Sequence, residues 1–369
     1  MSVTEAGSRS GGVPAGQEDR EGREALVPEI DLRTRIGPLE LTGPVLTASG
    51  CAAAGRELAP FLDVAGLGAV VTKSVLRAPR SGRGTPRMAE TPSGMLNSIG
   101  LQGPGIEAFC AHDLPWLREH GATVVASIAG NDVEEFAELA DRLAGEPGVG
   151  ALEVNISCPN VANRGLVFAC DPDAAEAVIG GVAEAVAGRV PVLAKLSPDV
   201  TDIVAIARVC LDAGADGLSM INTLLGMVID TTTLRPALAG VTGGLSGPAI
   251  RPVAVRCVWQ VHAAMRAGLL RPAPIVGIGG VLTGLDALQL VLAGACAVQV
   301  GTATFHDPSA PARVRVELGE ALARRGFTRF ADAVGFAHRS EASTLPGPGT
   351  GAAPGTGAVP GVVPRPAGA

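Results

Sequence analysis

The sequence predicts an α/β protein folded as a (β/α)8 barrel, the TIM-barrel fold. Short apolar runs rich in β-branched residues recur along the chain, and most are separated by segments with the i, i+3, i+4 apolar spacing of a helix. Eight such runs are found, the number that closes a barrel of parallel strands. A doubly wound open sheet has the same alternation and is the alternative.

The elements are expected in the following order. The predicted strands are Val45–Ala48, Ala69–Lys73, Thr123–Ser127, Ala151–Ser157, Val192–Leu196, Gly217–Ile221, Ile275–Ile278 and Ala297–Val300. The predicted helices include Val133–Leu143, Ala174–Val186, Ile203–Leu211, Ala254–Ala267 and Leu285–Ala293. Residues 31–41 precede the first strand and are expected to form a hairpin that closes the barrel floor. Two long connections, 74–122 and 223–274, are expected to carry function, because long loops on compact barrels usually do.

The two ends of the chain differ from its middle in composition. Residues 1–29 are polar and rich in Gly, and residues 341–369 consist mainly of Pro, Gly and Ala. Both segments carry too little apolar bulk to pack, so we expect disordered extensions there. Residues 30–340 then form one folded domain.

Composition excludes several classes of protein. The chain has 36 acidic and 29 basic residues and a net charge of −7, whereas nucleic-acid and anionic-membrane binders need a clustered positive face. Seven Cys without a C-x-x-C pair, and five His without paired ligand spacing, predict neither disulfides nor a bound metal or cluster. No apolar signal-peptide core and no apolar stretch of membrane-spanning length is present, so we expect a cytoplasmic protein.

The fourth predicted strand carries polar residues on one face. Glu153, Asn155 and Ser157 alternate with apolar residues, so they are expected to point into the barrel near its carboxyl end, where barrel active sites lie. Cys158 follows directly at the mouth. A buried Cys is usually a small hydrophobe, but the polar neighbours of Cys158 favour a functional thiol.

Lys and Asn are rare in this chain, and the surviving positions are informative. Lys73 and Lys195 are the only two lysines, and both lie in or at the end of apolar strands, where an ammonium group is costly unless it faces a polar site. Asn97 lies in the first long connection and Asn222 ends the sixth strand. An amide side chain both donates and accepts hydrogen bonds, so these residues together predict a pocket for a flat, amide-rich ligand.

Glycine turns follow the last two strands. Gly277, Gly279 and Gly280 follow or end the seventh strand, and Gly301 with Thr302 follows the eighth. Backbone amides at these two places form the phosphate site of many barrels, and the turn at Gly247 adds a third candidate. The predicted site residues lack the carboxylate pair of a sugar isomerase, so the pattern favours a phosphorylated cofactor such as FMN.

At these residues the chain resembles the class 1 dihydroorotate dehydrogenases, most closely the NAD-linked 1B type. The resemblance runs from about residue 31 to 340. It is densest in residues 85–102 (TPRMAETPSGMLNSIGLQ), 155–160 (NISCPN), 221–226 (INTLLG) and 243–249 (GGLSGPA).

The resemblance implies a TIM-barrel catalytic domain that holds one FMN and oxidises (S)-dihydroorotate to orotate in de novo pyrimidine (UMP) synthesis. Cys158 would be the base that takes the C5 proton while the C6 hydride passes to the flavin. The implied substrate-binding residues are Lys73, Asn97, Ser98, Ile99, Gly100, Leu101, Asn155, Asn222 and Thr223. The implied FMN-binding residues are Ser49, Lys73, Ser74, Ser127, Asn155, Lys195, Ile221, Gly247, Gly279, Gly280, Gly301 and Thr302.

The chain departs from the family pattern at Ser127, where Asn is usual and contacts the flavin. The resemblance also implies a partner subunit with FAD and a [2Fe–2S] cluster, because no site for either is visible here, and a homodimer core of a heterotetramer. Two alternatives stay open: a dihydropyrimidine dehydrogenase-like flavoenzyme, and a non-catalytic flavin- or phosphate-binding barrel. A transfer-RNA dihydrouridine synthase is disfavoured by the acidic charge.

Overall fold

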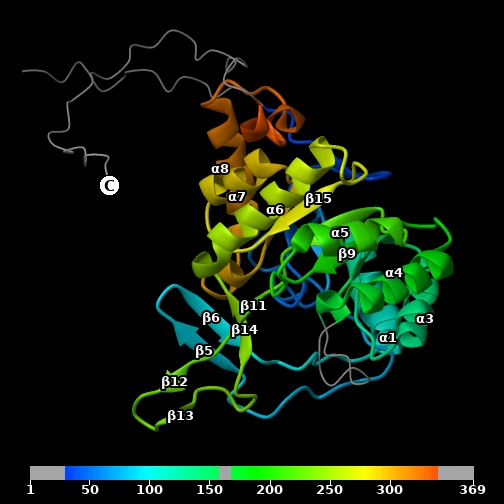
Figure 1. Cartoon of the computed structure of the whole chain (residues 1–369), viewed down its shortest axis with the longest axis vertical. Helices are drawn as coiled ribbons and strands as arrows, with labels where there is room; N and C mark the ends of the chain where they lie inside the picture. Colours follow the sequence, from blue (N-terminus) through cyan, green and yellow to red (C-terminus); the bar gives the residue numbers. More distant parts are fainter. Residues whose placement is uncertain (1–29, 158–167, 340–369) are drawn as a thin grey trace, which may run out of the picture.

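The computed structural model describes residues 30–157 and 168–339, and within them eight parallel strands form one sheet that closes on itself (Figure 1). The strand order is β3-β16-β15-β10-β9-β8-β7-β4. The ring closes between β3 and β4, where Gly68 N donates to Val45 O at 2.9 Å and Thr47 N donates to Ala69 O at 3.3 Å. The predicted barrel is therefore confirmed, and an open doubly wound sheet is excluded.

The barrel strands lie close to their predicted positions. They are β3 (Val45–Thr47), β4 (Val70–Val71), β7 (Val124–Ile128), β8 (Val149–Val154), β9 (Val192–Leu196), β10 (Gly217–Met220), β15 (Ile275–Ile278) and β16 (Ala297–Val300). The second and fourth strands end earlier than predicted. Beyond each of these strands the chain still forms backbone hydrogen bonds to β7 as it turns toward the barrel mouth. Val75 N donates to Ser127 O, and Asn155 N donates to Ile128 O.

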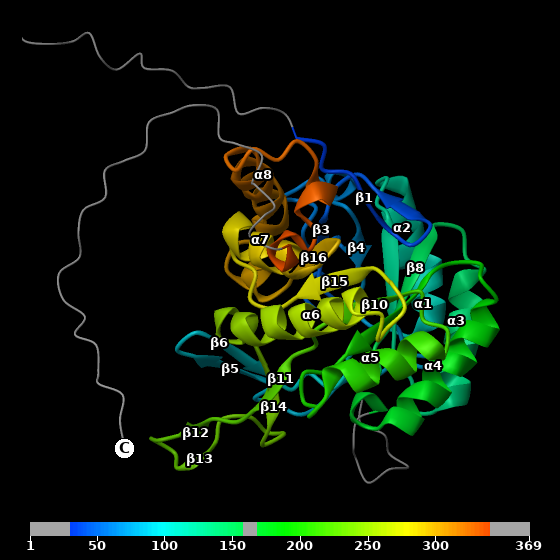
Figure 2. The same ribbon diagram turned by 45° about the horizontal axis from the view of Figure 1, so that its top comes forward.

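Helices cover the outside of the barrel (Figure 2). They include α3 (Val133–Ala144), α4 (Pro172–Val186), α5 (Ile203–Asp212), α6 (Arg251–Arg266), α7 (Gly284–Ala293) and α8 (Ala310–Ala323), with α1 (Ile106–Ala108) and α2 (Leu114–Glu119) between β4 and β7. Asp132, Asp171 and Asp202 cap the starts of α3, α4 and α5 by accepting backbone N–H groups. In the described ranges, no helix combines the length and the apolar character needed to cross a membrane.

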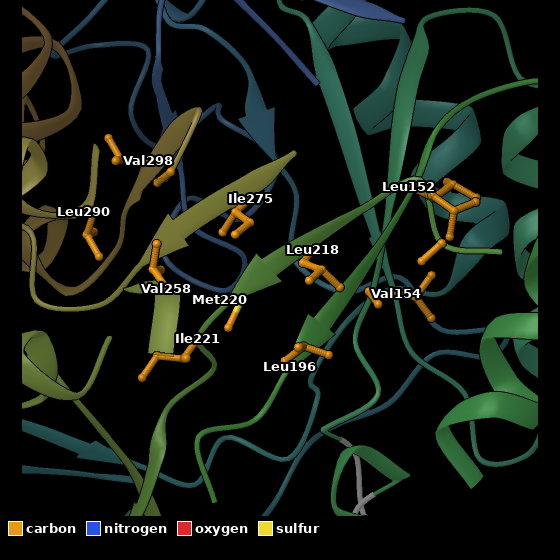
Figure 3. Close-up of a cluster of buried hydrophobic side chains, with 14 of the residues drawn as sticks. Leu152, Val154, Leu196, Leu218, Met220, Ile221, Val258, Ile275, Leu290 and Val298 are labelled. Carbon is orange, nitrogen blue, oxygen red and sulfur yellow. The ribbon is translucent and has the colours of Figure 1, made fainter. Parts of the chain in front are cut away.

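Two apolar clusters hold the barrel together. The larger fills the space between strands and helices, and Figure 3 shows part of it, including Leu152 of β8, Leu218 of β10 and Leu290 of α7. The smaller lies inside the barrel, with Val125 and Leu193 among its members. The predicted hairpin is present as β1 (Thr34–Ile36) and β2 (Leu39–Leu41), and its Ile36 and Leu41 side chains join this inner cluster and close the floor.

The interior changes from apolar to polar toward the carboxyl ends of the strands. Ala151 and Leu193 belong to the floor cluster, and the next inward residues along β8 and β9 are Glu153 and Lys195. The buried polar side chains of this upper layer are Thr47, Thr72, Ser127, Glu153, Lys195, Ser219 and Gln299. A polar layer thus underlies the mouth of the barrel.

The two long connections build a roof over that mouth. Antiparallel strands β5 (Met88–Thr91) and β6 (Gly94–Asn97) come from the first, and β11 (Leu224–Gly226) and β14 (Gly243–Ser246) come from the second. They pair in the order β11-β14-β6-β5, so segments far apart in sequence meet in one small sheet. A hairpin of β12 (Ile229–Asp230) and β13 (Arg235–Pro236) projects beyond it (Figure 1).

Candidate active site

A cavity of about 1360 Å³ lies between the carboxyl ends of the barrel strands and the roof. Its wall contains most of the residues that the sequence predicted for the site. These are Ser49, Lys73, Ser74, Asn97, Ser98, Ile99, Gly100, Leu101, Asn155, Lys195, Ile221, Asn222, Thr223, Gly247, Gly279, Gly280, Gly301 and Thr302. Cys158, the predicted base, lies outside the described residues, and Ser157 at the cavity wall is the last described residue before it.

A chain of hydrogen bonds crosses the barrel mouth. Asn222 Nδ2 donates to Asn155 Oδ1 at 3.1 Å, and Asn155 Nδ2 donates to Ser74 Oγ at 3.1 Å. The Ser74 hydroxyl also lies 3.4 Å from that of Ser49. These contacts join the ends of β3, β4, β8 and β10. They fix the two amide groups in defined orientations before any ligand arrives.

Ser127 has a different position from the other predicted residues. Its side chain is fully buried and is absent from the cavity wall, and its hydroxyl lies 3.0 Å from that of Ser74. The short side chain is therefore accommodated by a hydrogen bond beneath the cavity. Its assignment as a flavin contact stays a prediction, and in this structure it reaches the cavity through Ser74.

Both lysines face the cavity. Lys195 Nζ donates to Glu153 Oε1 at 3.0 Å inside the polar layer, and Gln299 Nε2 donates to the other oxygen, Oε2, at 2.7 Å. Lys73 lies against the turn after β3, since a Cβ added at Gly50 would meet its Nζ at 3.5 Å. The cavity wall thus carries two ammonium groups, one on β9 and one just after β4.

Cys51 at the cavity wall is a poor nucleophile. Burial raises the pKa of its thiol to about 11, against the opposing influence of Lys195 and Lys73. The thiol stays protonated near neutral pH. This environment fits a structural role, the usual one for a buried Cys.

The roof contributes the segment from Asn97 to Leu101. Asn97 Nδ2 donates to Gly244 O of β14 at 3.3 Å, and Arg83 Nη1 donates to Ser98 Oγ at 3.2 Å. Gly100 and Leu101 both have left-handed backbone, with φ of 79° and 57°. The chain therefore turns sharply along the cavity wall and exposes backbone there.

Two of the three predicted glycine turns, those at Gly247 and Gly280, pack against each other. A Cβ at Gly280, where φ is 71°, would lie 2.9 Å from Gly247 O and 2.6 Å from Arg251 Cβ. The turns after β14 and β15 are therefore packed so closely that a side chain would displace one of them. Arg251, the first residue of α6, donates to Gly280 O at 3.2 Å and so holds the turn in place.

This donor set fits a flavin mononucleotide. The glycine turns offer backbone N–H groups for a phosphate, and the lysines offer positive charge near the polar layer. Gln299 lines the cavity with a buried Oε1 that has no hydrogen-bond partner in the described part of the chain. The volume is above the usual range for one small ligand, roughly 300–1,000 Å³, as expected for a cofactor together with a substrate.

Some residues of the site were missed by sequence reasoning. Gln299 is one polar residue in the apolar run AVQV, and only its place two residues before Gly301 indicates an inward direction. Asp199 ties the roof to the barrel, because its two carboxylate oxygens each lie 3.1 Å from Leu225 N of β11. An Asp after a strand and Pro looks like an ordinary turn residue in sequence, so no local signal marks it.

The chain forms a closed barrel with a roofed cavity, and two lysines, three asparagines and the glycine turns line that cavity. These features define a cofactor-dependent enzyme of the TIM-barrel class. The family model described as dihydroorotate dehydrogenase matches residues 31–322. The chain therefore belongs to the dihydroorotate dehydrogenase family and is an oxidoreductase.

Curated relatives agree with this assignment. The chain is 52% identical over 312 residues, 85% of its length and 99% of the relative, to the dihydroorotate dehydrogenase B (NAD(+)) catalytic subunit of Desulforudis audaxviator. It is 49% identical over 305 residues to the proteins of the same description from Geotalea daltonii and Geobacter sulfurreducens, covering 83% of this chain and 97% of each relative.

Proposed function

We propose that the protein oxidises (S)-dihydroorotate to orotate in de novo pyrimidine synthesis, with FMN held in the roofed cavity. The observation that carries the proposal is the convergence, in one cavity of a family member, of both lysines of the chain, three asparagines and the glycine turns. The catalytic domain proposed for this activity spans residues 30–340. The extensions 1–29 and 341–369 are predicted to be disordered, and both lie outside the described residues, which end at Arg339.

The substrate is flat, anionic and rich in amide groups, and the cavity matches each property. Asn97, Asn155 and Asn222 present amides that both donate and accept, so they pair with ring N–H and C=O groups. Lys73 supplies positive charge for the carboxylate, and the backbone from Ser98 to Leu101 with Thr223 completes the substrate side of the wall.

When bound, FMN supplies the ring system that accepts a hydride from the substrate. The turns at Gly247, Gly279, Gly280 and Gly301 with Thr302 would hold its phosphate. Lys195 would offset negative charge that accumulates on the ring, acting within a buried polar layer where a charge has a strong effect. Ser49, Ser74 and Ile221 would line the rest of the ring site.

Cys158 is proposed as the base that takes the C5 proton of the substrate. The proposal rests on the NISCPN motif and on Asn155 and Ser157, which bring the chain to the cavity wall immediately before it. A thiolate is the reactive form, so the step needs a deprotonated Cys158.

The proposed electron acceptor is NAD, reached through a second subunit. The relatives are named NAD(+)-linked catalytic subunits, a name that implies a partner. We propose a partner with FAD and a [2Fe–2S] cluster, bound to a homodimer of this chain in a cytoplasmic heterotetramer. Within the described residues no cluster of His, Cys, Asp or Glu is arranged to hold a metal ion.

Reconstitution with FMN tests the proposal. The purified chain is expected to bind FMN, to bind riboflavin much more weakly because riboflavin lacks the phosphate, and to form orotate from dihydroorotate with an artificial acceptor. Activity with dihydrouracil or dihydrothymine in place of dihydroorotate would favour the dihydropyrimidine dehydrogenase-like alternative. Bound FMN without turnover of any of these would favour a non-catalytic flavin barrel.

A further inference from the structure

A buried carboxylate stands behind the cavity wall. Glu153 has no exposed surface, and it accepts hydrogen bonds from Lys195 at 3.0 Å and from Gln299 at 2.7 Å, one on each oxygen. The three side chains come from β8, its neighbour β9, and β16, which is separated from β9 by two strands of the ring. Glu153 therefore cross-links the polar layer.

Glu153 is set back from the ligand space. Lys195 and Gln299 both line the cavity, whereas Glu153 is absent from its wall. It can act on a ligand only through its two partners and through its charge. A buried charge is costly and an ion pair of this kind contributes little net stability, so stability alone does not explain its presence.

The two hydrogen bonds also orient the partners. A carboxylate only accepts, so the Gln299 amide must direct its Nε2 to Glu153, and its Oε1 is the group left without a protein partner in the described residues. The Lys195 ammonium is likewise held at one place on the wall. Glu153 thus fixes the position of the Lys195 charge and the orientation of the Gln299 amide.

We propose that Glu153 is a positioning residue that sets the reduction potential of the bound flavin by partly neutralising Lys195 and holding Gln299 as an acceptor. The inference rests on the proposed function, because it requires FMN in the cavity. Reduced flavin is more negative than oxidised flavin, so a lone Lys195 charge would favour the reduced form. The Glu153 carboxylate weakens that preference and keeps the potential lower, which eases the onward transfer of electrons.

The test is the midpoint potential of bound FMN, measured anaerobically against a reference dye in the full chain. Glu153→Gln keeps the side-chain shape and removes the charge. We expect the ratio of reduced to oxidised FMN at a fixed potential to rise about tenfold, which is about +30 mV for a two-electron couple. Glu153→Asp, whose carboxylate is one methylene shorter, should shift the ratio in the same direction by a smaller factor, about two- to threefold.

Ser219→Ala is the matched control. Ser219 is fully buried beside Lys195 in the sheet register, its hydroxyl has no partner in the described residues, and its loss changes no charge. The potential of this variant should equal that of the wild type. A comparable shift in Ser219→Ala would show that any change in the layer alters the flavin, which overturns the proposal.

The outcomes separate this inference from the proposed function. Suppose that wild-type protein holds FMN that dihydroorotate reduces, but that the Glu153 variants bind oxidised and reduced FMN more weakly by the same factor. The midpoint potential then does not change, and Glu153 has only a structural role. If Glu153→Gln does not fold, Glu153→Asp decides by the same criterion. Wild-type protein that holds no FMN contradicts the proposed function itself.

Discussion

The amide of Asn222 donates to the amide oxygen of Asn155 at 3.1 Å, across the mouth of the barrel from β10 to β8. Asn222 is itself anchored, because its backbone N donates to Leu196 O at 2.8 Å and its Oδ1 accepts from Thr223 N at 2.8 Å. The two amides of the proposed substrate face are therefore held by contacts within the protein.

Removing that contact should impair catalysis more than folding. We expect Asn222→Ala to lower kcat/KM for dihydroorotate by about 30- to 150-fold, since it deletes one proposed substrate contact and releases Asn155, each equivalent to about 1–1.5 kcal/mol. Steady-state kinetics and a thermal melt measure the two effects. Gln260→Ala on the exposed side of α6 removes an amide far from the cavity and should leave kcat/KM unchanged. An equal loss in both variants would contradict the assignment.

The proposed role of the glycine turns can be tested at two glycines that have nearly the same backbone conformation. Gly280 and Gly188 have φ of 71° and 73°, but an added Cβ is crowded only at Gly280, and at Gly188 it meets nothing within 4 Å. Both Ala variants should lose about 1 kcal/mol of stability from the left-handed backbone. Only Gly280→Ala should also weaken FMN binding, by at least about tenfold because the turn must shift. Fluorescence titration of the apoprotein measures this, and unchanged FMN affinity in Gly280→Ala would argue against a phosphate site at the turn.

The proposed base predicts a pH dependence. An unperturbed thiol has a pKa of about 8.5, and its deprotonated form takes the proton, so the rate of flavin reduction should rise with pH up to the pKa of Cys158 and then level off. Cys158→Ala should retain FMN and be reduced at least about 100-fold more slowly. Stopped-flow measurements at several pH values check both. Cys110→Ala, outside the cavity wall, is the control, and rapid reduction of Cys158→Ala would remove Cys158 from the mechanism.

Acid stability should depend on His262. Burial, with His338 and Arg266 nearby, lowers the pKa of His262 from its ordinary 6.5 to about 4. The unfolded chain therefore binds more protons than the folded one between these values, and the free energy of unfolding falls as pH drops from about 6.5 toward 4. His262→Gln should remove about 1 kcal/mol of that fall, an amount reduced for the partial exposure of the ring.

Chemical denaturation at pH 7 and pH 5 measures the effect of His262. The exposed His112 provides the matched substitution, His112→Gln, which should retain the wild-type pH dependence. A wild-type slope in His262→Gln would show that other groups cause the loss of stability in acid.

Much of the site was predictable because its residues break local rules. Few structural explanations exist for a lysine in an apolar strand, as at Lys73 and Lys195, or for glycines directly after strands. The positions of these residues were therefore informative. Gln299 and Asp199 break no such rule. Their roles depend on which strand face turns inward and on contacts with residues distant in sequence, and periodicity does not supply either. Ser127 illustrates the same limit: its strand was predicted, but its separation from the cavity by Ser74 depends on packing.

In the proposed reaction, dihydroorotate delivers electrons to a flavin in this cavity. An anaerobic titration of the FMN-loaded protein with dihydroorotate tests it most directly. The flavin absorbance should bleach in proportion to added substrate, orotate should form in amounts equal to the FMN reduced, and Cys158→Ala should bleach far more slowly. If the flavin of the FMN-loaded protein stays oxidised in excess dihydroorotate, dihydroorotate is not the electron donor at this site.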